Sequence, residues 1–198
     1  MTTEHWDGVF TTKAPDDVSW FQAEPATSLR LLRAYAPPPA SVLDVGSGNG
    51  VLPDRLLAGG WPDVTVLDVS AAALDAVRGR LGDAVTYAVS DVTAWRPART
   101  YGAWHDRAVF HFLTSFGDVA SYVARATAAV APGGVAVLAT FAPDGPEQCS
   151  GLPAKRYAAE ALAGAFGGAF TLEAAEREEH VTPWGAVQPF TWVVLRRR

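Results

Sequence analysis

A glycine-rich loop at residues 44–50 constrains the fold of this chain more than any other feature. The short apolar run Val42–Val45 carries an acid at position 44 and passes into glycines at positions 46, 48 and 50. Glycine has no Cβ and tolerates positive φ, so such a loop lets the backbone approach a ligand closely. Residues 51–58 have helical character, with Pro53 in the first turn. A strand, a glycine loop and a helix N-terminus in this order predict a nucleotide-type site at the head of a βαβ unit.

Composition favours a globular protein of one domain. The chain has 198 residues, 49% of them hydrophobic and 19% charged, which is typical of folded rather than disordered proteins. The net charge of −5 argues against a nucleic-acid-binding protein. The single cysteine, Cys149, excludes an internal disulfide and fits a reducing compartment. No signal-peptide pattern or membrane-spanning run is found, so we expect a cytoplasmic protein without a membrane partner.

Strand-like and helix-like segments alternate along the chain. Alternating βα units predict a parallel sheet with helices on both faces. Glycines and prolines stand where the helices are expected to end. Short apolar runs rich in β-branched residues occur at 42–45, 64–69, 85–89, 103–110 and 135–141, and helix-length stretches lie at 70–81, 117–130 and 154–166.

The two ends of the chain differ from this pattern. Residues 170–177 and 190–197 are both strand-like and are joined by a segment without helical period, so they are expected to pair antiparallel. The prediction is an α/β fold: a doubly wound, mostly parallel seven-stranded sheet with an antiparallel last strand. Residues 1–198 form one domain in this interpretation, with a helical flap segment at 1–40 and a Rossmann-like core at 41–198. Trp20 belongs either to the core or to the flap.

The loop departs from the dinucleotide-binding fingerprint. That fingerprint needs a third glycine at position 51, where this chain has Val51. The sequence Asp44-x-Gly46-x-Gly48-x-Gly50 instead resembles the first motif of the class I S-adenosylmethionine-dependent methyltransferases. The resemblance implies the methyltransferase form of the doubly wound fold and S-adenosylmethionine as the cofactor.

Acids at the ends of three successive strands support this resemblance. Asp68 ends the second strand and matches the carboxylate that accepts from both ribose hydroxyls in the family. Asp91 follows the third strand, where an acid accepts from the adenine amino group while Val92 covers the ring. A single such acid is often only a helix N-cap. The cofactor-binding residues that we predict are Asp44, Gly46, Ser47, Gly48, Asp68, Val69, Asp91, Val92, His105 and Trp20.

The fourth strand leads into the segment that faces the transferred methyl group in the family. Residues 104–108, Trp-His-Asp-Arg-Ala, resemble locally the Trp-Asp-Arg-Gly segment of thiopurine-type methyltransferases and the Asp-Lys-Gly segment of some protein lysine methyltransferases, with Ala108 in place of glycine. A base near the acceptor would remove its proton, and His105 and Asp106 are the predicted catalytic residues. The alternatives are a structural histidine and an Asp106–Arg107 ion pair. The predicted substrate residues are Arg107, His111, Cys149 and Tyr157.

Two loops are expected at the substrate edge, 142–153 and 180–189, and long loops of this kind often carry function. The second brings His180, Trp184 and Gln188 as further pocket candidates. No ligand-pair spacing predicts a metal site.

The predicted function is transfer of a methyl group to S, N or O of a small molecule by a monomer or homodimer. The alternatives are a protein lysine N-methyltransferase and a regulatory protein that binds the cofactor without catalysis.

Overall fold

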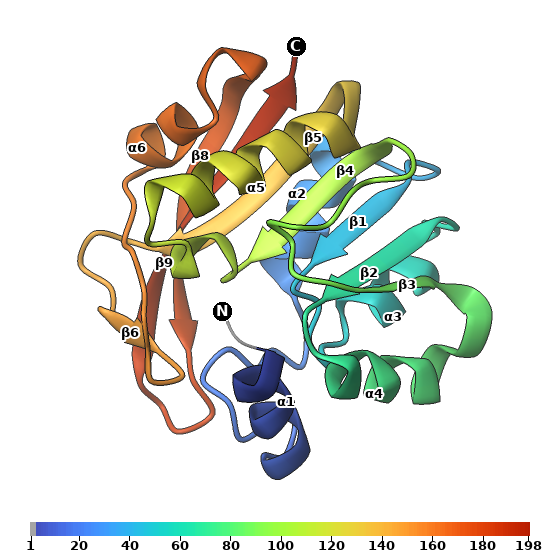
Figure 1. The fold of residues 1–198 in the computed structure, drawn as a ribbon, viewed down its shortest axis with the longest axis vertical. Helices are drawn as coiled ribbons and strands as arrows, with labels where there is room; N and C mark the ends of the chain where they lie inside the picture. Colours follow the sequence, from blue (N-terminus) through green and yellow to red (C-terminus); the bar gives the residue numbers. More distant parts are fainter. Residues whose placement is uncertain (1–2) are drawn as a thin grey trace.

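A mixed sheet of seven strands forms the centre of the protein (Figure 1). The structure is a computed structural model and describes residues 3–198. Within these residues the strand order is β3-β2-β1-β4-β5-β9-β8. The strands are β1 (Val42–Val45), β2 (Val64–Asp68), β3 (Thr86–Val89), β4 (Tyr101–Arg107), β5 (Val130–Phe141), β8 (Phe170–Val181) and β9 (Val187–Arg197), and a separate two-stranded hairpin is formed by β6 (Gln148–Cys149) and β7 (Leu152–Pro153).

The direction of the strands confirms the predicted fold class. β1 pairs in parallel with β2 on one side and with β4 on the other, and β4 pairs in parallel with β5. β9 runs antiparallel to both β5 and β8. The chain order reverses between β1 and β4, and doubly wound sheets bind ligands over the carboxyl ends of the strands at such a point.

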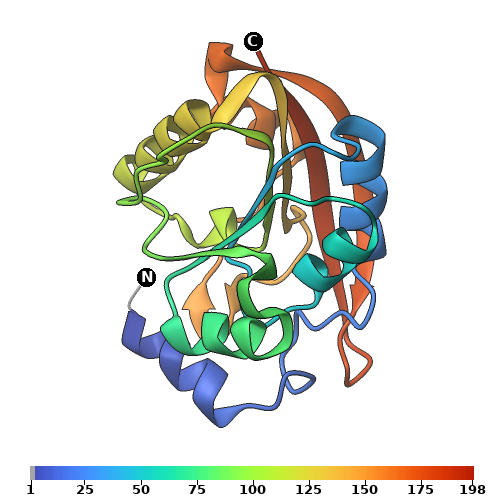
Figure 2. The same ribbon diagram turned by 90° about the vertical axis from the view of Figure 1, so that its right-hand side faces the viewer.

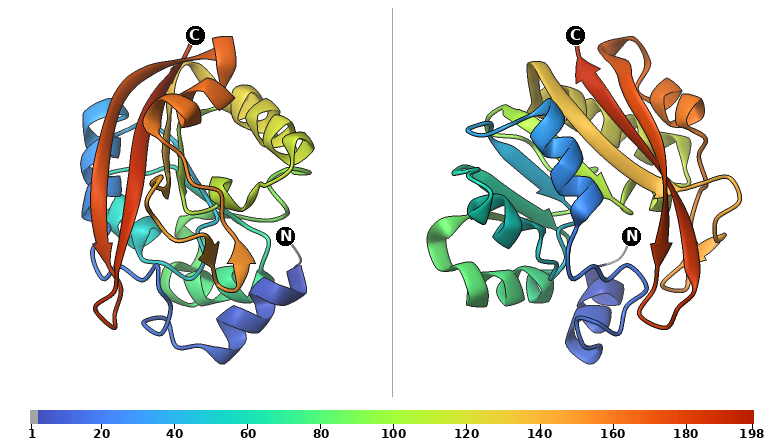
Figure 3. Two further views of the ribbon diagram at one scale, coloured as in Figure 1. Left: turned by 90° about the vertical axis from the view of Figure 1, so that its left-hand side faces the viewer. Right: turned by 180° about the vertical axis from the view of Figure 1, so that it is seen from behind.

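Helices cover both faces of the sheet (Figures 2 and 3). Successive strand residues point to opposite faces, so each strand supplies two cores. Val42 packs on the side of helices α2 and α3, and Leu43 packs on the side of α5 and α6. The helix bounds are α1 (Thr3–Thr12), α2 (Ala26–Tyr35), α3 (Leu52–Ala58), α4 (Ala71–Leu81), α5 (Phe116–Ala129) and α6 (Ala159–Ala165), with short 3-10 turns η1 (Gly82–Ala84), η2 (Phe110–Phe112) and η3 (Gly167–Ala169).

Helix α1 stands apart from the two helical layers. It lies below the carboxyl ends of β1, β2 and β4 and beside α4 (Figure 1). The contact includes a hydrogen bond from the Ser70 hydroxyl to the Asp7 carboxylate. Ser70 also caps α4, since its Oγ accepts from the Ala73 N–H at 3.2 Å, as its position before an alanine-rich helix predicts. No helix within residues 3–198 is both long enough and apolar enough to cross a membrane.

Several elements differ from the predicted boundaries. The fourth strand ends at Arg107 rather than at 110, because Ala108 has a φ of +74° and turns the chain away from the sheet. Helix α6 begins at Ala159, after an extended stretch, rather than at 154. The segment 180–189, predicted as irregular, contains the end of β8 and the start of β9 joined by a tight turn, because hydrogen bonds from Gly185 and Ala186 back to Thr182 close a β8–β9 hairpin.

Candidate active site

A cavity of about 370 Å³ lies at the carboxyl edge of the sheet, around the point where the strand order reverses. All ten residues predicted to bind the cofactor line this cavity. Other residues that line it include Ser28, Arg80, Arg107, Ala108, Cys149 and the aromatic residues Trp6, Phe10 and Phe112. The volume is in the range of ligand sites in proteins. The strand ends therefore bring together candidate residues from the ends of β1, β2, β3 and β4.

The glycine loop is packed too closely for side chains at two of its positions. Gly46 has a φ of +64°, and a Cβ there would lie 2.0 Å from Cγ2 of Val109. Gly48 has a φ of +56°, and its Cβ would lie 3.2 Å from the ring of Phe10. The left-handed backbone favours glycine at both positions; a Cβ at Gly46 has no room beside Val109, and a Cβ at Gly48 would make the ring of Phe10 shift. The loop backbone consequently forms part of the cavity wall.

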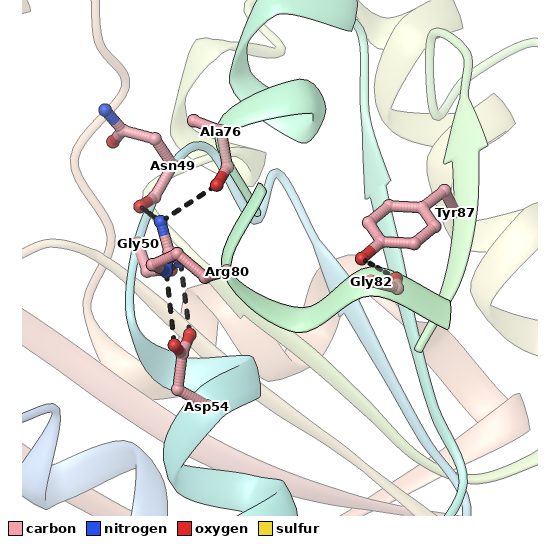
Figure 4. Close-up of polar contacts among 7 residues, drawn as sticks. All are labelled: Asn49, Gly50, Asp54, Ala76, Arg80, Gly82 and Tyr87. Carbon is pink, nitrogen blue, oxygen red and sulfur yellow. Dashed lines mark hydrogen bonds and ion pairs between the residues drawn. The ribbon is translucent and has the colours of Figure 1, made fainter. Parts of the chain in front are cut away.

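Arg80 fixes the far end of the loop (Figure 4). This residue lies in the last turn of α4, and its guanidinium donates to the carbonyl of Asn49 at 3.1 Å and to the carbonyl of Gly50 at 2.6 Å. The same group forms an ion pair with Asp54 of α3 at 3.1 Å. Arg80 thus joins α4, the loop and α3 at the border of the cavity. Sequence reasoning missed this role, because the pairing partners are 26 to 31 residues away along the chain.

Asp68 at the end of β2 and Asp91 just after β3 differ in how many of their carboxylate oxygens accept hydrogen bonds from the protein. Both oxygens of Asp68 accept backbone N–H groups, one from Gly48 and one from Ser70, each at 2.8 Å. Burial raises the pKa of Asp68 to about 6, although the two N–H donors oppose this shift. Asp91 uses Oδ1 to accept from the N–H and hydroxyl of Thr93 at 2.8 and 2.7 Å. Each carboxylate oxygen has two lone pairs, so both acids retain acceptor capacity toward the cavity.

His105 is held between an acid and a hydroxyl. Its Nδ1 lies 2.7 Å from Oδ1 of Asp44, and its Nε2 lies 2.9 Å from Oγ of Ser28. All three side chains are buried and all three residues line the cavity. If the Asp44 carboxylate accepts the Nδ1–H, Nε2 is left to accept the Ser28 O–H. The geometry makes Asp44, His105 and Ser28 one hydrogen-bonded chain. Ser28 was not among the residues predicted from the sequence.

Asp106, the second predicted catalytic residue, does not reach the cavity. Its carboxylate accepts the N–H of Val109 at 2.8 Å and of Phe110 at 3.1 Å, and it also accepts the hydroxyl of Tyr122. The side chain is fully buried on the α5 side of the sheet, because residues 105 and 106 of one strand must point to opposite faces. The structure gives Asp106 the role of fixing the turn after β4. It forms no ion pair with Arg107.

The four predicted substrate residues divide into two pairs. Arg107 and Cys149 line the cavity, whereas His111 and Tyr157 do not. His111 packs against Phe112 and Phe141, and burial together with the charge of Arg107 lowers its pKa to about 3. Tyr157 packs against Phe110 in the core on the α5 side. Burial raises the pKa of the Cys149 thiol to about 11, so this group is a neutral wall of the cavity.

An aromatic cover closes the cavity on the side of α1. Trp6 meets Phe10, Trp20 and Phe112 with ring centroids 6.2, 5.9 and 5.3 Å apart, and Trp6 is only 8% exposed. Trp6, Phe10 and Phe112 were not predicted as site residues. The spacing of four between Trp6 and Phe10, on one face of an N-terminal helix, is the sequence signal that could have indicated them.

A smaller hollow of about 230 Å³ adjoins the cavity and shares Trp20 and Cys149 with it. Of the further pocket candidates, Trp184 and Gln188 line this hollow. His180 instead lies against the backbone, with its Nε2 2.6 Å from the carbonyl oxygen of Ser19. The β6–β7 hairpin and the β8–β9 turn thus border the hollow together with the N-terminal segment.

The sheet order and the glycine-loop cavity together define the class I methyltransferase fold. A family model described as "Methyltransferase domain" matches residues 19–184, and the chain belongs to this family. It is an S-adenosylmethionine-dependent methyltransferase of class I.

Known proteins resemble the chain to different extents. The N-methyltransferase NodS of Bradyrhizobium japonicum WM9, solved with S-adenosyl-L-homocysteine, is similar with a TM-score of 0.75 and 15% identity over 98% of this chain and 97% of that one. A Burkholderia thailandensis 1,6-didemethyltoxoflavin-N1-methyltransferase, solved with its namesake compound and S-adenosylhomocysteine, is similar with a TM-score of 0.72 and 20% identity over 98% and 83% of the two chains. The mouse EEF1A lysine methyltransferase 2 is 37% identical over 82 residues, a stretch that spans about a third, 34%, of that protein.

The residues of the cavity fit S-adenosylmethionine. Gly46 and Gly48 line the cavity, where a backbone without Cβ atoms can approach a ligand closely. Two carboxylates with spare acceptor capacity stand next to the apolar side chains of Val69 and Val92, which suits a nucleoside with a polar sugar and a flat base. The third acid of the cavity, Asp44, suits the positively charged amine of the cofactor.

Proposed function

We propose that this methyltransferase transfers a methyl group to a sulfur, nitrogen or oxygen atom of a small molecule. The observation that carries the proposal is the aromatic cover, in which Trp6, Phe10 and Trp20 contact one another above the cavity. This cover leaves room for a compact molecule inside, whereas a side chain of a folded protein would have to pass it. The Burkholderia protein, whose name gives 1,6-didemethyltoxoflavin as the methylated compound, supports the same proposal.

The alternative is a protein lysine N-methyltransferase. The 82-residue match to the mouse lysine methyltransferase favours it. The β8–β9 turn also carries Val181, Trp184 and Val187 with more than half of each residue exposed, which is the kind of surface that proteins bind. Against it stands the guanidinium of Arg107, which lines the cavity without an ion-pair partner among the described residues and would repel a lysine ammonium.

The proposed cofactor contacts follow from the cavity walls. Asp68 would hold the ribose, Asp91 the adenine amino group, and Val69 and Val92 the faces of the base. Gly46, Ser47 and Gly48 would hold the methionine part, close to Asp44. Bound S-adenosylmethionine supplies an electrophilic methyl group on its sulfonium. The protein contributes positioning of the acceptor and exclusion of water.

We propose that His105 moves or holds the proton that the acceptor gives up. Its Nε2 is hydrogen-bonded to Ser28, both residues line the cavity, and the contact of Nδ1 with Asp44 fixes the orientation of the ring. Replacing His105 by Gln, or Ser28 by Ala, is expected to lower turnover by about 10²-fold, the scale of general base catalysis. The affinity for S-adenosylhomocysteine is expected to change less. Turnover at the wild-type rate in both variants would show that this chain of residues is structural.

The experiment that separates the two acceptor classes uses label. Protein is incubated with methyl-labelled S-adenosylmethionine and a cell lysate that has been separated by size into a macromolecular and a small-molecule fraction. Label is expected in the small-molecule fraction. Label confined to protein, and retained at lysine after hydrolysis, would instead support the alternative.

A further inference from the structure

The guanidinium of Arg107 is buried with one of its edges unused. Nη1 donates to the backbone carbonyl of Trp20 at 3.0 Å, and the group lies over the ring of Phe190 at 4.7 Å. Nε and Nη2 are buried and have no hydrogen-bond partner among the described residues. These two nitrogens point their N–H groups in the same direction, which is the edge that binds both oxygens of a carboxylate.

No protein carboxylate among residues 3–198 pairs with this edge. Burial lowers the pKa of Arg107, and the charge of Glu178 opposes this shift. The oxygens of Glu178 already accept hydrogen bonds from Gln22, Thr27 and Trp192. The neighbouring His111 is neutral at physiological pH and offers no negative charge. An unpaired buried cation is costly, so a negative partner is expected.

The position of Arg107 indicates where this partner comes from. The residue ends β4, the strand that carries the proposed proton-transfer residue His105, and its guanidinium lies over Phe190 of β9 and near enough to Cys149 for its charge to act on the thiol. Arg107 and Cys149 both line the cavity, and Cys149 also lines the smaller hollow beside it. A ligand that reaches Arg107 therefore occupies the acceptor end of the site.

We propose that Arg107 is the carboxylate-binding residue of the acceptor site, so that the methylated molecule is a small carboxylic acid. This inference rests on the proposed small-molecule function. Nε and Nη2 bind the two carboxylate oxygens side-on, and Trp20 and Phe190 hold the guanidinium in place. The planar, two-pronged match selects a carboxylate over a neutral amide, because an amide would leave one donor without an acceptor.

The first test examines the labelled product. Small molecules that acquire label from S-adenosylmethionine are isolated and coupled to an amine with a carbodiimide. The labelled product is expected to form an amide through its carboxyl group and so to gain the mass of the amine less that of one water. A labelled small molecule without a carboxyl group overturns this inference and leaves the proposed function intact, whereas label only in protein overturns both.

The second test does not require the natural acceptor. Protein saturated with S-adenosylhomocysteine is melted in sodium acetate and in sodium chloride of equal ionic strength. Acetate at about ten times its dissociation constant is expected to raise the Tm of the wild type by roughly 2–4 °C. The Arg107→Gln variant is expected to show no such rise, and the exposed Arg156→Gln variant should behave like the wild type. Equal shifts in wild type and Arg107→Gln, or no shift in the wild type, would overturn the inference.

S-adenosylmethionine has a carboxylate of its own, and the same variant distinguishes this second source. Arg107→Gln is expected to bind S-adenosylhomocysteine within about threefold of the wild type. A loss of tenfold or more would assign the guanidinium to the cofactor and overturn the inference. On the natural acceptor, the variant should raise KM by at least about tenfold with a smaller effect on kcat, which a general loss of folding would not produce.

Discussion

At the scale of single residues, strands β2 and β4 carry acids that the fold keeps away from water, Asp68 in the cavity and Asp106 outside it. Asp68 is 7% exposed and Asp106 is not exposed, and burial raises the pKa of each to about 6. Both carboxylates are compensated by N–H donors of the backbone, and Asp106 also by Tyr122. Burying these acids therefore costs folding stability. A perturbed pKa such as that of Asp68, which lines the cavity, is common at binding sites.

The raised pKa of Asp68 predicts a pH dependence. The folded protein binds this proton more tightly than the unfolded chain, so the contribution of Asp68 is most favourable below about pH 4 and is lost as the pH rises through about 6. Asp68→Asn removes this loss. Urea unfolding at pH 4.5 and 7.5 is expected to show the variant gaining up to about 3 kcal/mol relative to wild type at the higher pH.

The control for this pH prediction is Asp63→Asn. Arg99 lowers the pKa of Asp63 by a hydrogen bond, so this acid stabilises the folded state at neutral pH and loses that contribution as the pH falls. As the pH rises from 4.5 to 7.5, the free energy of unfolding relative to the wild type should therefore increase for Asp68→Asn and decrease for Asp63→Asn. The same difference in free energy of unfolding between Asp68→Asn and the wild type at both pH values would contradict the prediction.

Ala108 occupies a backbone conformation that suits glycine. Its φ of +74° lies in the left-handed region, which costs an L-residue about 1–2 kcal/mol, and glycine avoids most of this cost. Ala108→Gly is expected to raise the free energy of unfolding by about 0.5–1 kcal/mol in urea titrations. The same change at Ala175, in the regular strand β8, should lower it by a similar amount. A destabilised Ala108→Gly variant would show that the turn is not strained.

At the scale of elements, the cofactor cavity depends on segments outside the βα repeat. Helix α1 supplies Trp6 and Phe10, the segment before α2 supplies Trp20, and the β6–β7 hairpin supplies Cys149. These pieces reach the site by loops rather than through the sheet (Figure 1). Elements of this kind open locally more readily than a central sheet does.

We expect α1 with the Trp20 segment, and the loop 142–153, to close over a filled site. Hydrogen exchange with and without S-adenosylhomocysteine should show amides in residues 3–25 and 142–153 slowing by at least about fivefold, with little change in β1, β4 and β5. Trp6→Ala should reduce the slowing in both segments if they close together. Full protection of both segments before ligand is added would mean that they are fixed walls.

At the scale of the whole molecule, the sequence predicted the sheet better than its covering. The alternation of apolar strands and helices indicated the parallel order, since each period reports burial on a local face. The acids at positions 44, 68 and 91 could be placed at one edge because parallel strands end together. The same reasoning could not separate His105 from Asp106. Their opposite orientation depends on the exact phase of β4, and a shift of one residue would exchange them.

Contacts between distant parts of the chain account for what sequence reasoning missed. Ser28 and His105 are 77 residues apart, and Arg80 meets the loop across about 30 residues. The hairpin at 148–153 and the extension of β8 and β9 lie in segments that were predicted as irregular. The pairing of these strands depends on hydrogen bonds that leave no local periodicity in the sequence. The substrate candidates His111 and Tyr157 are near cavity-lining residues in the sequence, but neither of them lines the cavity.

The central claim is that one cavity at the carboxyl edge binds S-adenosylmethionine, with Asp68 as its ribose ligand. The most direct measurement is a calorimetric titration with S-adenosylhomocysteine of the wild type, of Asp68→Ala and of the surface control Asp63→Ala. We expect micromolar affinity for the wild type and the control, and at least about tenfold weaker binding for Asp68→Ala, from the loss of charge-assisted hydrogen bonds. Equal affinity of Asp68→Ala and wild type, or a preference of the wild type for a nicotinamide cofactor, would contradict the account.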